Sequence, residues 1–282
     1  MDIELIGVPF DGYGRPGNQA RAAAALRAAG LQAALGAHDG GDVELPPGDP
    51  TRGPRTGLVN EGALLVMAER LGERLRATSR FPVVVGGDCS VLLGIIPALA
   101  PVGLLCVDGH EDTMPLDVSE DGEAANTEIG LLLGLTGRLL PVELRDRFAV
   151  LDRNALAMIG PRDDRWRARF NVGSLAGHGV WARALPDITD ATGAEAVAHV
   201  GRPWWLHVDL DVLDPADFPA QGVPGDDGTS GGLTWDRLTA LLAAAVGAGG
   251  CVGMSFVIYD PDQDPTGLDA RRIVRLIADV ID

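Results

Sequence analysis

The stretch WWLHVDLDVLDP, residues 204–215, decides the fold of this 282-residue chain. Its first half is apolar enough for a buried strand, and its second half carries Asp209, Asp211 and Asp214. Side chains two residues apart in extended backbone point to the same side, so Asp209 and Asp211 can converge on one point. Open α/β sheets place their chemistry at the carboxyl ends of the strands. The stretch therefore predicts a strand of an α/β protein that ends in a carboxylate site.

A second predicted strand ends in the same way. In LLCVDGHEDTMP, residues 104–115, the apolar run leads into Asp108, His110 and Asp112. Clustered carboxylates in a partly buried site repel one another unless a cation lies between them, and oxygen ligands with one imidazole suit Mn²⁺, Mg²⁺ or Fe²⁺ better than structural zinc. A solvated acidic rim is the alternative. Two such clusters, each at the end of an apolar strand, favour the metal site.

A third stretch, VVVGGDCSVLL at residues 83–93, predicts a buried strand followed by a helix with Ser90 near its cap. Cys89 then stands at the carboxyl end of a strand. The neighbouring carboxylates would raise the pKa of a free thiol and make it a poor nucleophile. We predict that Cys89 binds metal as a thiolate, and the alternative is a small apolar residue that fills the turn.

Short apolar strands alternate with longer amphipathic stretches along the whole chain. We predict strands at residues 3–8, 82–85, 103–107, 157–159, 204–208 and 251–257, and helices at 19–35, 62–77, 90–99, 128–135, 194–199, 234–246 and 268–280. This alternation predicts a mainly parallel sheet with helices on both faces. Two long stretches rich in Gly, Pro and Asp, 36–57 and 215–232, are expected to be irregular, and the second is expected to be functional because it follows the acidic cluster.

The composition limits the class of partner. The net charge is −17, the sequence pI is about 4.6, and all the positive side chains at neutral pH are arginines. Such a surface argues against nucleic acids and anionic membranes as partners, and it suits a cationic small-molecule substrate or metal ions. The apolar runs are too short to span a membrane, and the first residues lack the features of a signal peptide. Three cysteines in apolar surroundings fit a reducing compartment, so we expect a cytoplasmic protein.

With these motifs in place, the sequence resembles the arginase–agmatinase (ureohydrolase) family. GGDCS at 86–90, DGHED at 108–112 and HVDLDVLDP at 207–215 are similar to the GGDHS, DAHxD and SxDxDxxDP motifs of that family. Segments 3–30, 158–164 and 231–234 extend the resemblance over nearly the whole chain. It implies a single domain over residues 1–282 with a three-layer α/β/α fold. It also implies two Mn²⁺ ions bridged by a hydroxide that attacks a guanidinium carbon, and a homo-oligomer such as the trimers or hexamers common in the family.

The resemblance also implies a role for each ligand. By position, Asp108 and Asp209 would bridge both ions, His110 and Asp211 would complete one metal position, Asp112 and Cys89 would complete the other, and Asp112 would also hold the nucleophilic hydroxide. Two ions clamped in this way acidify a bound water and stabilise a tetrahedral intermediate. A thiolate would make the site softer than the usual histidine does, so Zn²⁺, Fe²⁺ or Co²⁺ would also be accepted.

Three positions depart from the family pattern. Cys89 replaces the metal-binding histidine, Ala125 stands where the family has a proton-shuttling histidine, and Ile258 stands where a glutamate faces the guanidinium. We therefore expect weak activity on arginine and agmatine, because an isoleucine offers nothing to offset the burial of a cation.

Other residues can compensate for these losses. We predict that His207 moves protons, with a core-facing histidine as the alternative, and that Asp163 contacts an amine of the substrate, as its position in the family implies. Glu128 is predicted to bind a cationic group, and its alternative is a carboxylate that only favours the start of a helix.

These observations predict a binuclear metal hydrolase that cleaves a C–N bond in a guanidine-like small molecule, such as an N-hydroxylated guanidine. One alternative is a single-metal amidohydrolase, similar to deacetylases, that uses Asp108, His110, Asp209 and Asp211. Another is a catalytically silent, metal-binding regulatory subunit. The survival of the non-cysteine ligands argues against the silent subunit, since nothing else would justify their mutual repulsion.

Overall fold

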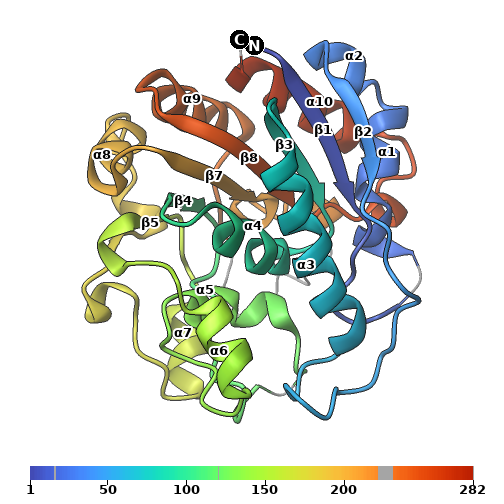
Figure 1. The fold of residues 1–282 in the computed structure, drawn as a ribbon. Coiled ribbons are helices and arrows are strands. Elements are labelled where there is room, and N and C mark those ends of the chain that lie inside the picture. The colour runs from blue at the N-terminus through green and yellow to red at the C-terminus, as the bar shows by residue number, and fades with distance from the viewer. Residues whose placement is uncertain (16, 120, 222–230, 282) are drawn as a thin grey trace.

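The computed structural model describes residues 1–15, 17–119, 121–221 and 231–281, and in this part of the chain eight strands form one sheet (Figure 1). The strands are β1 (Ile3–Val8), β2 (His38–Asp42), β3 (Phe81–Gly86), β4 (Gly103–Val107), β5 (Leu156–Ile159), β6 (Trp181–Arg183), β7 (Trp204–Asp209) and β8 (Cys251–Val257). Their order is β2-β1-β3-β8-β7-β4-β5-β6, and every neighbouring pair is parallel. The predicted sheet is confirmed.

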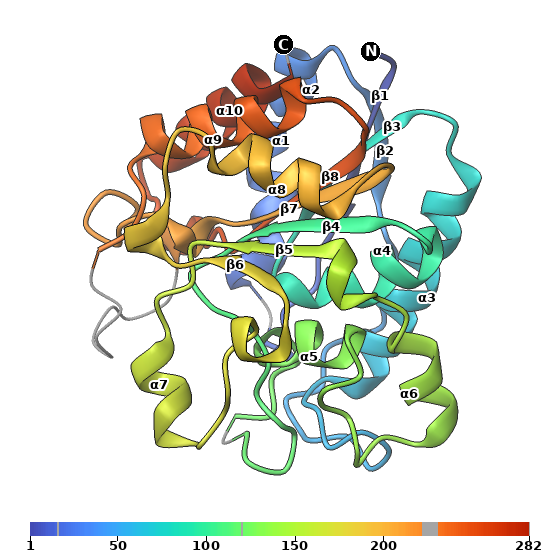
Figure 2. The same ribbon diagram turned by 90° about the vertical axis from the view of Figure 1, so that its left-hand side faces the viewer.

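Helices cover both faces of the sheet, so the fold has three layers (Figure 2). They are α1 (Ala22–Ala28), α2 (Leu31–Leu35), α3 (Glu61–Ala77), α4 (Leu92–Leu99), α5 (Glu128–Leu132), α6 (Val142–Phe148), α7 (Asp164–Arg169), α8 (Thr192–Val200), α9 (Trp235–Gly247) and α10 (Leu268–Ile281). Alternate side chains of each strand feed two separate cores. In β1, Ile3 and Leu5 pack with α1, α2, α8, α9 and α10, whereas Ile6 and Val8 pack with α3, α4, α5 and α6.

Two strands, β2 and β6, were not predicted from the sequence. β2 lies inside the stretch 36–57 that was expected to be irregular, and its sequence, HDGGD, has no apolar alternation because it is a largely exposed edge strand. The side chain of Arg27 bonds to Asp39 and Asp42 and so ties this edge to α1. β6 is only three residues long and pairs with β5 at the opposite edge. Edge strands need fewer apolar residues than central strands do. The apolar pattern of the sequence therefore does not mark β2 and β6.

The predicted helix at 19–35 is wrong in its continuity. A 3₁₀ turn (Asn18–Arg21) precedes α1, and α1 and α2 are separated at Gly30, which has a left-handed φ of 96°. The helix predicted at 90–99 begins as a 3₁₀ turn (Cys89–Val91), and its cap is Asp88 rather than Ser90. α6 and α7, which are short and rich in charged residues, were not predicted.

The long stretch 215–232 is described only in part, since residues 222–230 lie outside the described residues. Its first residues form a turn in which Asp214 accepts the backbone N–H of Ala216 at 2.9 Å, as expected for an Asp-Pro turn. In the described part of the chain, none of the helices combines the length and the apolar character needed to cross a bilayer.

The strand order positions the predicted ligands. β3, β8, β7 and β4 lie side by side in the middle of the sheet, and since they are parallel their carboxyl ends share one edge. Cys89, Asp108 and Asp209, which follow or end three of these strands, are thereby brought together from positions far apart in the sequence.

Candidate metal centre

Two aspartates at the strand ends each use one oxygen to hold the local turn and turn the other toward the centre. Oδ1 of Asp108 accepts the backbone N–H of His110 at 2.7 Å, and Oδ1 of Asp209 accepts that of Asp211 at 2.7 Å. The second oxygens, both Oδ2, lie 3.8 Å and 2.8 Å from the sulfur of Cys89. Capping thus fixes the two carboxylates that were predicted to bridge the metal ions.

One group of donors consists of Asp108, His110 and Asp211, whose ligand atoms all lie within 4.8 Å of one another. Nδ1 of His110 is 2.9 Å from Oδ2 of Asp211, and the backbone N–H of Gly109 holds the other oxygen of Asp211 at 3.1 Å. A Cβ atom at position 109 would lie 2.6 Å from that oxygen, so any other residue here would make the neighbouring side chains shift. The group matches the first metal position that the resemblance implied.

A second group consists of Cys89, Asp112 and Glu128, and a third of Cys89, Asp108 and Asp209; each has its ligand atoms within 4.8 Å. The shared residue is Cys89. Asp112 has a left-handed φ of 45°, which breaks the alternation expected for Asp108, His110 and Asp112. Its side chain consequently joins Cys89 and Glu128 rather than His110.

The electrostatics of this cluster demand a cation. Burial, with Asp211 nearby, raises the pKa of Asp108 to about 7, and burial likewise raises the pKa values of Asp112 and Asp209. Burial opposes protonation of His110, yet Asp211 and Asp108 raise its pKa to about 9. A donor set of buried carboxylates, one imidazole and one thiol fits divalent metal ions, which would neutralise the acids in place of protons.

The thiol of Cys89 shows the same requirement. Burial, followed by the charges of Asp209 and Asp108, raises its pKa well above the ordinary value. A thiolate at this place therefore needs a directly bound cation, as the sequence reasoning argued. Its role as a ligand remains a prediction.

His207 lies behind Cys89 and does not line the cavity described below. Its Nε2 is 3.3 Å from the sulfur of Cys89, and its Nδ1 is 2.7 Å from the hydroxyl of Ser255, which also accepts the indole N–H of Trp205 at 2.9 Å. The Ser255 hydroxyl can also donate to the carbonyl of Leu206 at 3.5 Å, and the roles of the two ring nitrogens in these contacts depend on which tautomer the ring adopts. Burial lowers the pKa of His207 to about 3, so the ring is neutral.

Asp163 belongs to none of the three donor groups and forms a polar cluster with Arg167 and Glu111. Its Oδ1 accepts from Nε of Arg167 at 3.0 Å, and its Oδ2 accepts the backbone N–H of Glu111 at 3.2 Å. Asp163 is buried, and Arg167 also pairs with the Glu111 carboxylate at 3.4 Å. Both oxygens of Asp163 are thus engaged within the protein, and the predicted contact with a substrate amine stays untested.

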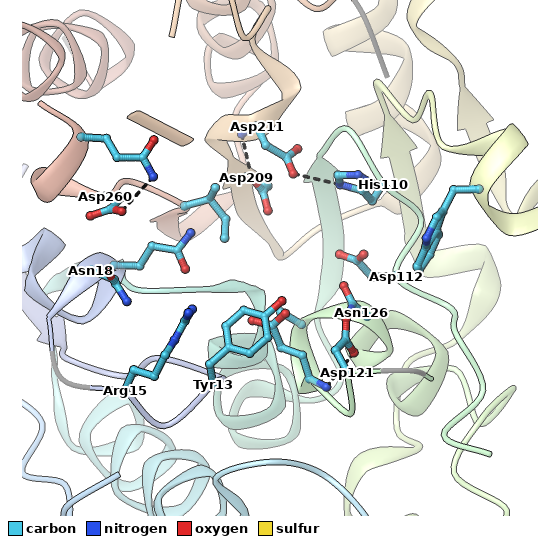
Figure 3. Close-up of a pocket in the computed structure, with 16 residues that line it drawn as sticks. Tyr13, Arg15, Asn18, His110, Asp112, Asp121, Asn126, Asp209, Asp211 and Asp260 are labelled. Carbon is cyan, nitrogen blue, oxygen red and sulfur yellow. Dashed lines mark hydrogen bonds and ion pairs between the residues drawn. The ribbon is translucent and has the colours of Figure 1, made fainter. Parts of the chain in front are cut away.

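A cavity of about 440 Å³ opens above the centre (Figure 3). Its acidic lining residues are Asp112, Asp121, Glu123, Asp209, Asp211 and Asp260. Ile258 and Ala125 also line the cavity. They stand where the family has the glutamate and the shuttle histidine, respectively. Arg15, across the cavity from His110 and Asp211 in Figure 3, is a cation on the wall. The cavity lining thus combines acidic side chains with apolar ones, such as Ile258 and Ala125, and with the guanidinium of Arg15.

Several lining residues were not found from the sequence. Tyr13, Arg15, Trp166 and Asp260 come from loops that follow strands or from the short helix α7. No motif or periodicity marks such positions. Glu123 and Asn126, which are close in sequence to Ala125, also line the cavity.

Comparisons with known proteins agree with the fold and the motifs. A sequence model of the Arginase family matches residues 1–281. An arginase from Staphylococcus aureus (strain MRSA252) is 26% identical over 299 residues, which cover 98% of this chain and 95% of that protein. Among solved structures, arginase from Bacillus caldovelox superposes with a TM-score of 0.85 at 23% identity and covers 99% of this chain and 97% of that one. The proclavaminate amidino hydrolase from Streptomyces clavuligerus superposes with a TM-score of 0.72 at 25% identity, over 99% of this chain and 90% of that one.

Proposed function

This chain belongs to the arginase family, and from that premise we propose that it is a binuclear metal-dependent hydrolase of a modified guanidino compound. Family membership gives the coarser statement, an enzyme that hydrolyses a non-peptide C–N bond in a linear amidine or guanidine. The two-ion centre, the identity of the metal and the substrate are the proposed part. Mn²⁺ is the usual metal of the family, and the thiol of Cys89 makes Zn²⁺, Fe²⁺ or Co²⁺ acceptable as well.

The observation that carries the proposal is the convergence of separate donor groups beneath a single cavity. Asp108, His110 and Asp211 form one group, and Cys89 and Asp112 belong to another. Asp108 and Asp209 lie between them, with an oxygen of each turned toward the sulfur of Cys89. Six donors, namely four carboxylates, one imidazole and one thiolate, would hold two divalent ions, as the sequence motifs suggested.

The bound ions would acidify water at neutral pH and hold positive charge beside the charge that develops on the scissile group. The side chains of the protein would orient the attacking water and position the metal ligands. Asp112 lines the cavity and would orient the attacking water and accept its proton. His207 has no access to the cavity, so we propose that it positions the Cys89 sulfur rather than carrying protons to the substrate.

The cavity lining suggests the class of substrate. The acidic side chains favour a cation, and Arg15 at the opposite wall favours an anionic group at the far end of the same molecule. Ile258 leaves one side of the reacting group without a charged partner, which suits a guanidine whose nitrogen carries a substituent such as a hydroxyl. The amidino hydrolase among the structural neighbours is named for a substrate other than arginine.

The test is to load the purified protein with Mn²⁺, measure bound metal by elemental analysis, and assay a panel of guanidino compounds. The panel includes arginine, agmatine and their N-hydroxylated forms, with urea, hydroxyurea and amine as measured products. Asp108→Ala is the inactive control. Two bound ions with turnover of a modified guanidine support the proposal. One bound ion with turnover favours the single-metal hydrolase, and two ions with no turnover of any compound favour the silent subunit.

A further inference from the structure

Glu128 is a buried acid whose charge has no partner in the structure. It is the first residue of α5, its side chain is completely buried, and neither carboxylate oxygen has a satisfactory hydrogen bond among the described residues. The nearest polar side chain is Asp112, another carboxylate, and two carboxylates can share a hydrogen bond only if a proton lies between them. A charged group buried without a partner is very costly, so this carboxylate either holds a proton or is compensated by a cation.

The surroundings of Glu128 point to a metal ion as that partner. Its carboxylate lies within 4.8 Å of both the Cys89 sulfur and an oxygen of Asp112, which makes the three a possible ligand group. No cationic side chain belongs to this group. The carboxylate is not part of the cavity lining, so a cationic substrate in the cavity cannot reach it.

The backbone holds Glu128 in this place. The N–H of Gly130 donates to the carbonyl of Asp112 at 3.0 Å, and the N–H of Met114 donates to the carbonyl of Asn126 at 2.9 Å. These two bonds tie the start of α5 to the segment that carries Asp112. Glu128 and Asp112 therefore reach the centre together, and a carboxylate so fixed is preorganised for a ligand role.

From this geometry we infer that Glu128 is a metal ligand, which joins Cys89 and Asp112 at the second metal position. The inference rests on the proposed metal centre and adds an oxygen donor to it. It also gives a reason for the loss of the histidine: where a thiolate replaces the imidazole, the carboxylate of Glu128 supplies an additional hard donor to the same ion. The cationic group that Glu128 was predicted to bind would then be a metal ion.

The test compares Glu128→Gln with Glu123→Gln. Both variants remove one buried acid from the same segment, but Glu123 lines the cavity, bonds to Tyr13 and belongs to none of the ligand groups. Bound metal is counted by elemental analysis, and Mn²⁺ and Co²⁺ affinities are measured by calorimetry. Glu128→Gln should weaken one ion at least about tenfold, because removal of even an outer partner of a ligand costs about 10–100-fold. Glu123→Gln should leave both affinities unchanged.

A second measurement guards against a folding defect. Without metal, Glu128→Gln should melt at about the same temperature as the parent protein, since burial raises the pKa of Glu128 and an amide of the same shape then replaces a neutral acid. With metal, it should gain less in melting temperature than the parent does. A metal-free variant that melts lower, or affinities equal to those of the parent, would overturn the ligand role.

The count of ions separates this inference from the proposed function. If the parent protein binds a single ion and Glu128→Gln weakens it, the ligand role stands and the two-ion centre fails. If the parent binds two ions and the variant binds both unchanged, the two-ion centre stands and the ligand role fails.

Discussion

The sulfur of Cys89 lies 2.8 Å from Oδ2 of Asp209, and both groups are buried. In the absence of metal the thiol would donate its proton to this carboxylate. Replacement of that proton by a cation would convert the pair into two ligands of one ion, and Nε2 of His207 lies 3.3 Å from the same sulfur. The contact therefore links the chemistry of Cys89 to the occupancy of the centre.

The first prediction concerns Cys89→Ser and Cys89→His. Serine should weaken one of the two bound ions by at least about tenfold, because a neutral hydroxyl replaces a thiolate ligand. Histidine should largely restore Mn²⁺ binding and reduce the preference for Zn²⁺ and Co²⁺, since it makes the site harder. Elemental analysis and calorimetry measure both effects. In the Co²⁺-loaded parent protein, a sulfur-to-metal charge-transfer band should appear and should vanish in both variants. Full metal content and activity in Cys89→Ser would show that the cysteine only fills the turn.

The second prediction concerns Ser255→Ala. The change removes the partner of both Trp205 and His207, which should lower the free energy of unfolding by about 1–3 kcal/mol. It also frees the His207 ring to turn, so metal affinity should fall by about tenfold, as for other outer partners of a ligand. Chemical denaturation and calorimetry give the two quantities.

Thr239→Ala is the control for that prediction, because it removes a side-chain hydrogen bond from α9, which lies in the opposite layer from α3 and α4 and away from the metal donors. It should change stability slightly and metal affinity not at all. If Ser255→Ala loses the expected stability but keeps the full metal affinity, His207 does not position the sulfur.

The third prediction concerns Ile258→Glu. Ile258 lines the cavity with a left-handed φ of 62°, a conformation that β-branched residues rarely adopt. Glutamate relieves this strain and offers a carboxylate to a bare guanidinium, so kcat/KM for arginine or agmatine should rise by about 10–100-fold, the value of a hydrogen bond to a charged group. Steady-state assays on the parent and the variant measure the change. Efficient hydrolysis of arginine or agmatine by the parent protein would contradict it.

The sequence predicts the central sheet because its strands are strongly apolar and end in recognisable motifs. β3, β4, β7 and β8 were all found in this way. β2 was missed because an edge strand that faces solvent has no apolar period, and the break at Gly30 was missed because a single left-handed residue leaves the helical pattern on both sides intact.

The site residues that stand in short sequence motifs were predictable. Those that only the folded structure brings to the site were not. Asp108, His110, Asp209 and Asp211 stand in short motifs, and the strand order alone brings the motifs together. Glu128 was noticed, yet nothing in the sequence indicates that its carboxylate is buried beside Cys89 and Asp112. That depends on two backbone hydrogen bonds between loops, which no local pattern encodes.

The fourth prediction compares Asp209→Ala with Asp214→Ala. Asp209 faces the Cys89 sulfur and also holds the turn to Asp211, so its loss should abolish binding of at least one ion and all activity. The side chain of Asp214 bonds only to the backbone of Ala216 among the described residues, so its loss should affect stability by about 0.5–2 kcal/mol, in the range of a lost cap, and leave metal content unchanged. Elemental analysis and thermal melts separate the two effects. Retention of two ions in Asp209→Ala would contradict the bridging role.

The fifth prediction is that metal binding strengthens as pH rises through about 7 and then about 9, the raised pKa values of Asp108 and His110. The pKa of Asp108 is raised to about 7 and that of His110 to about 9, so both hold protons in the metal-free protein that a metal ion must displace. Because both values lie above those of the unfolded chain, their contribution to the stability of the metal-free protein is present at low pH and is lost as pH rises through about 7 and then about 9. The affinity for metal increases over the same pH range. The difference in melting temperature between the metal-loaded and the metal-free protein should therefore widen as pH rises. Thermal melts at fixed Mn²⁺ concentration, together with calorimetry in buffers of different ionisation enthalpy, measure the difference and the protons released. A constant or narrowing difference in melting temperature, or metal binding without proton release, would show that the metal does not displace protons from these side chains.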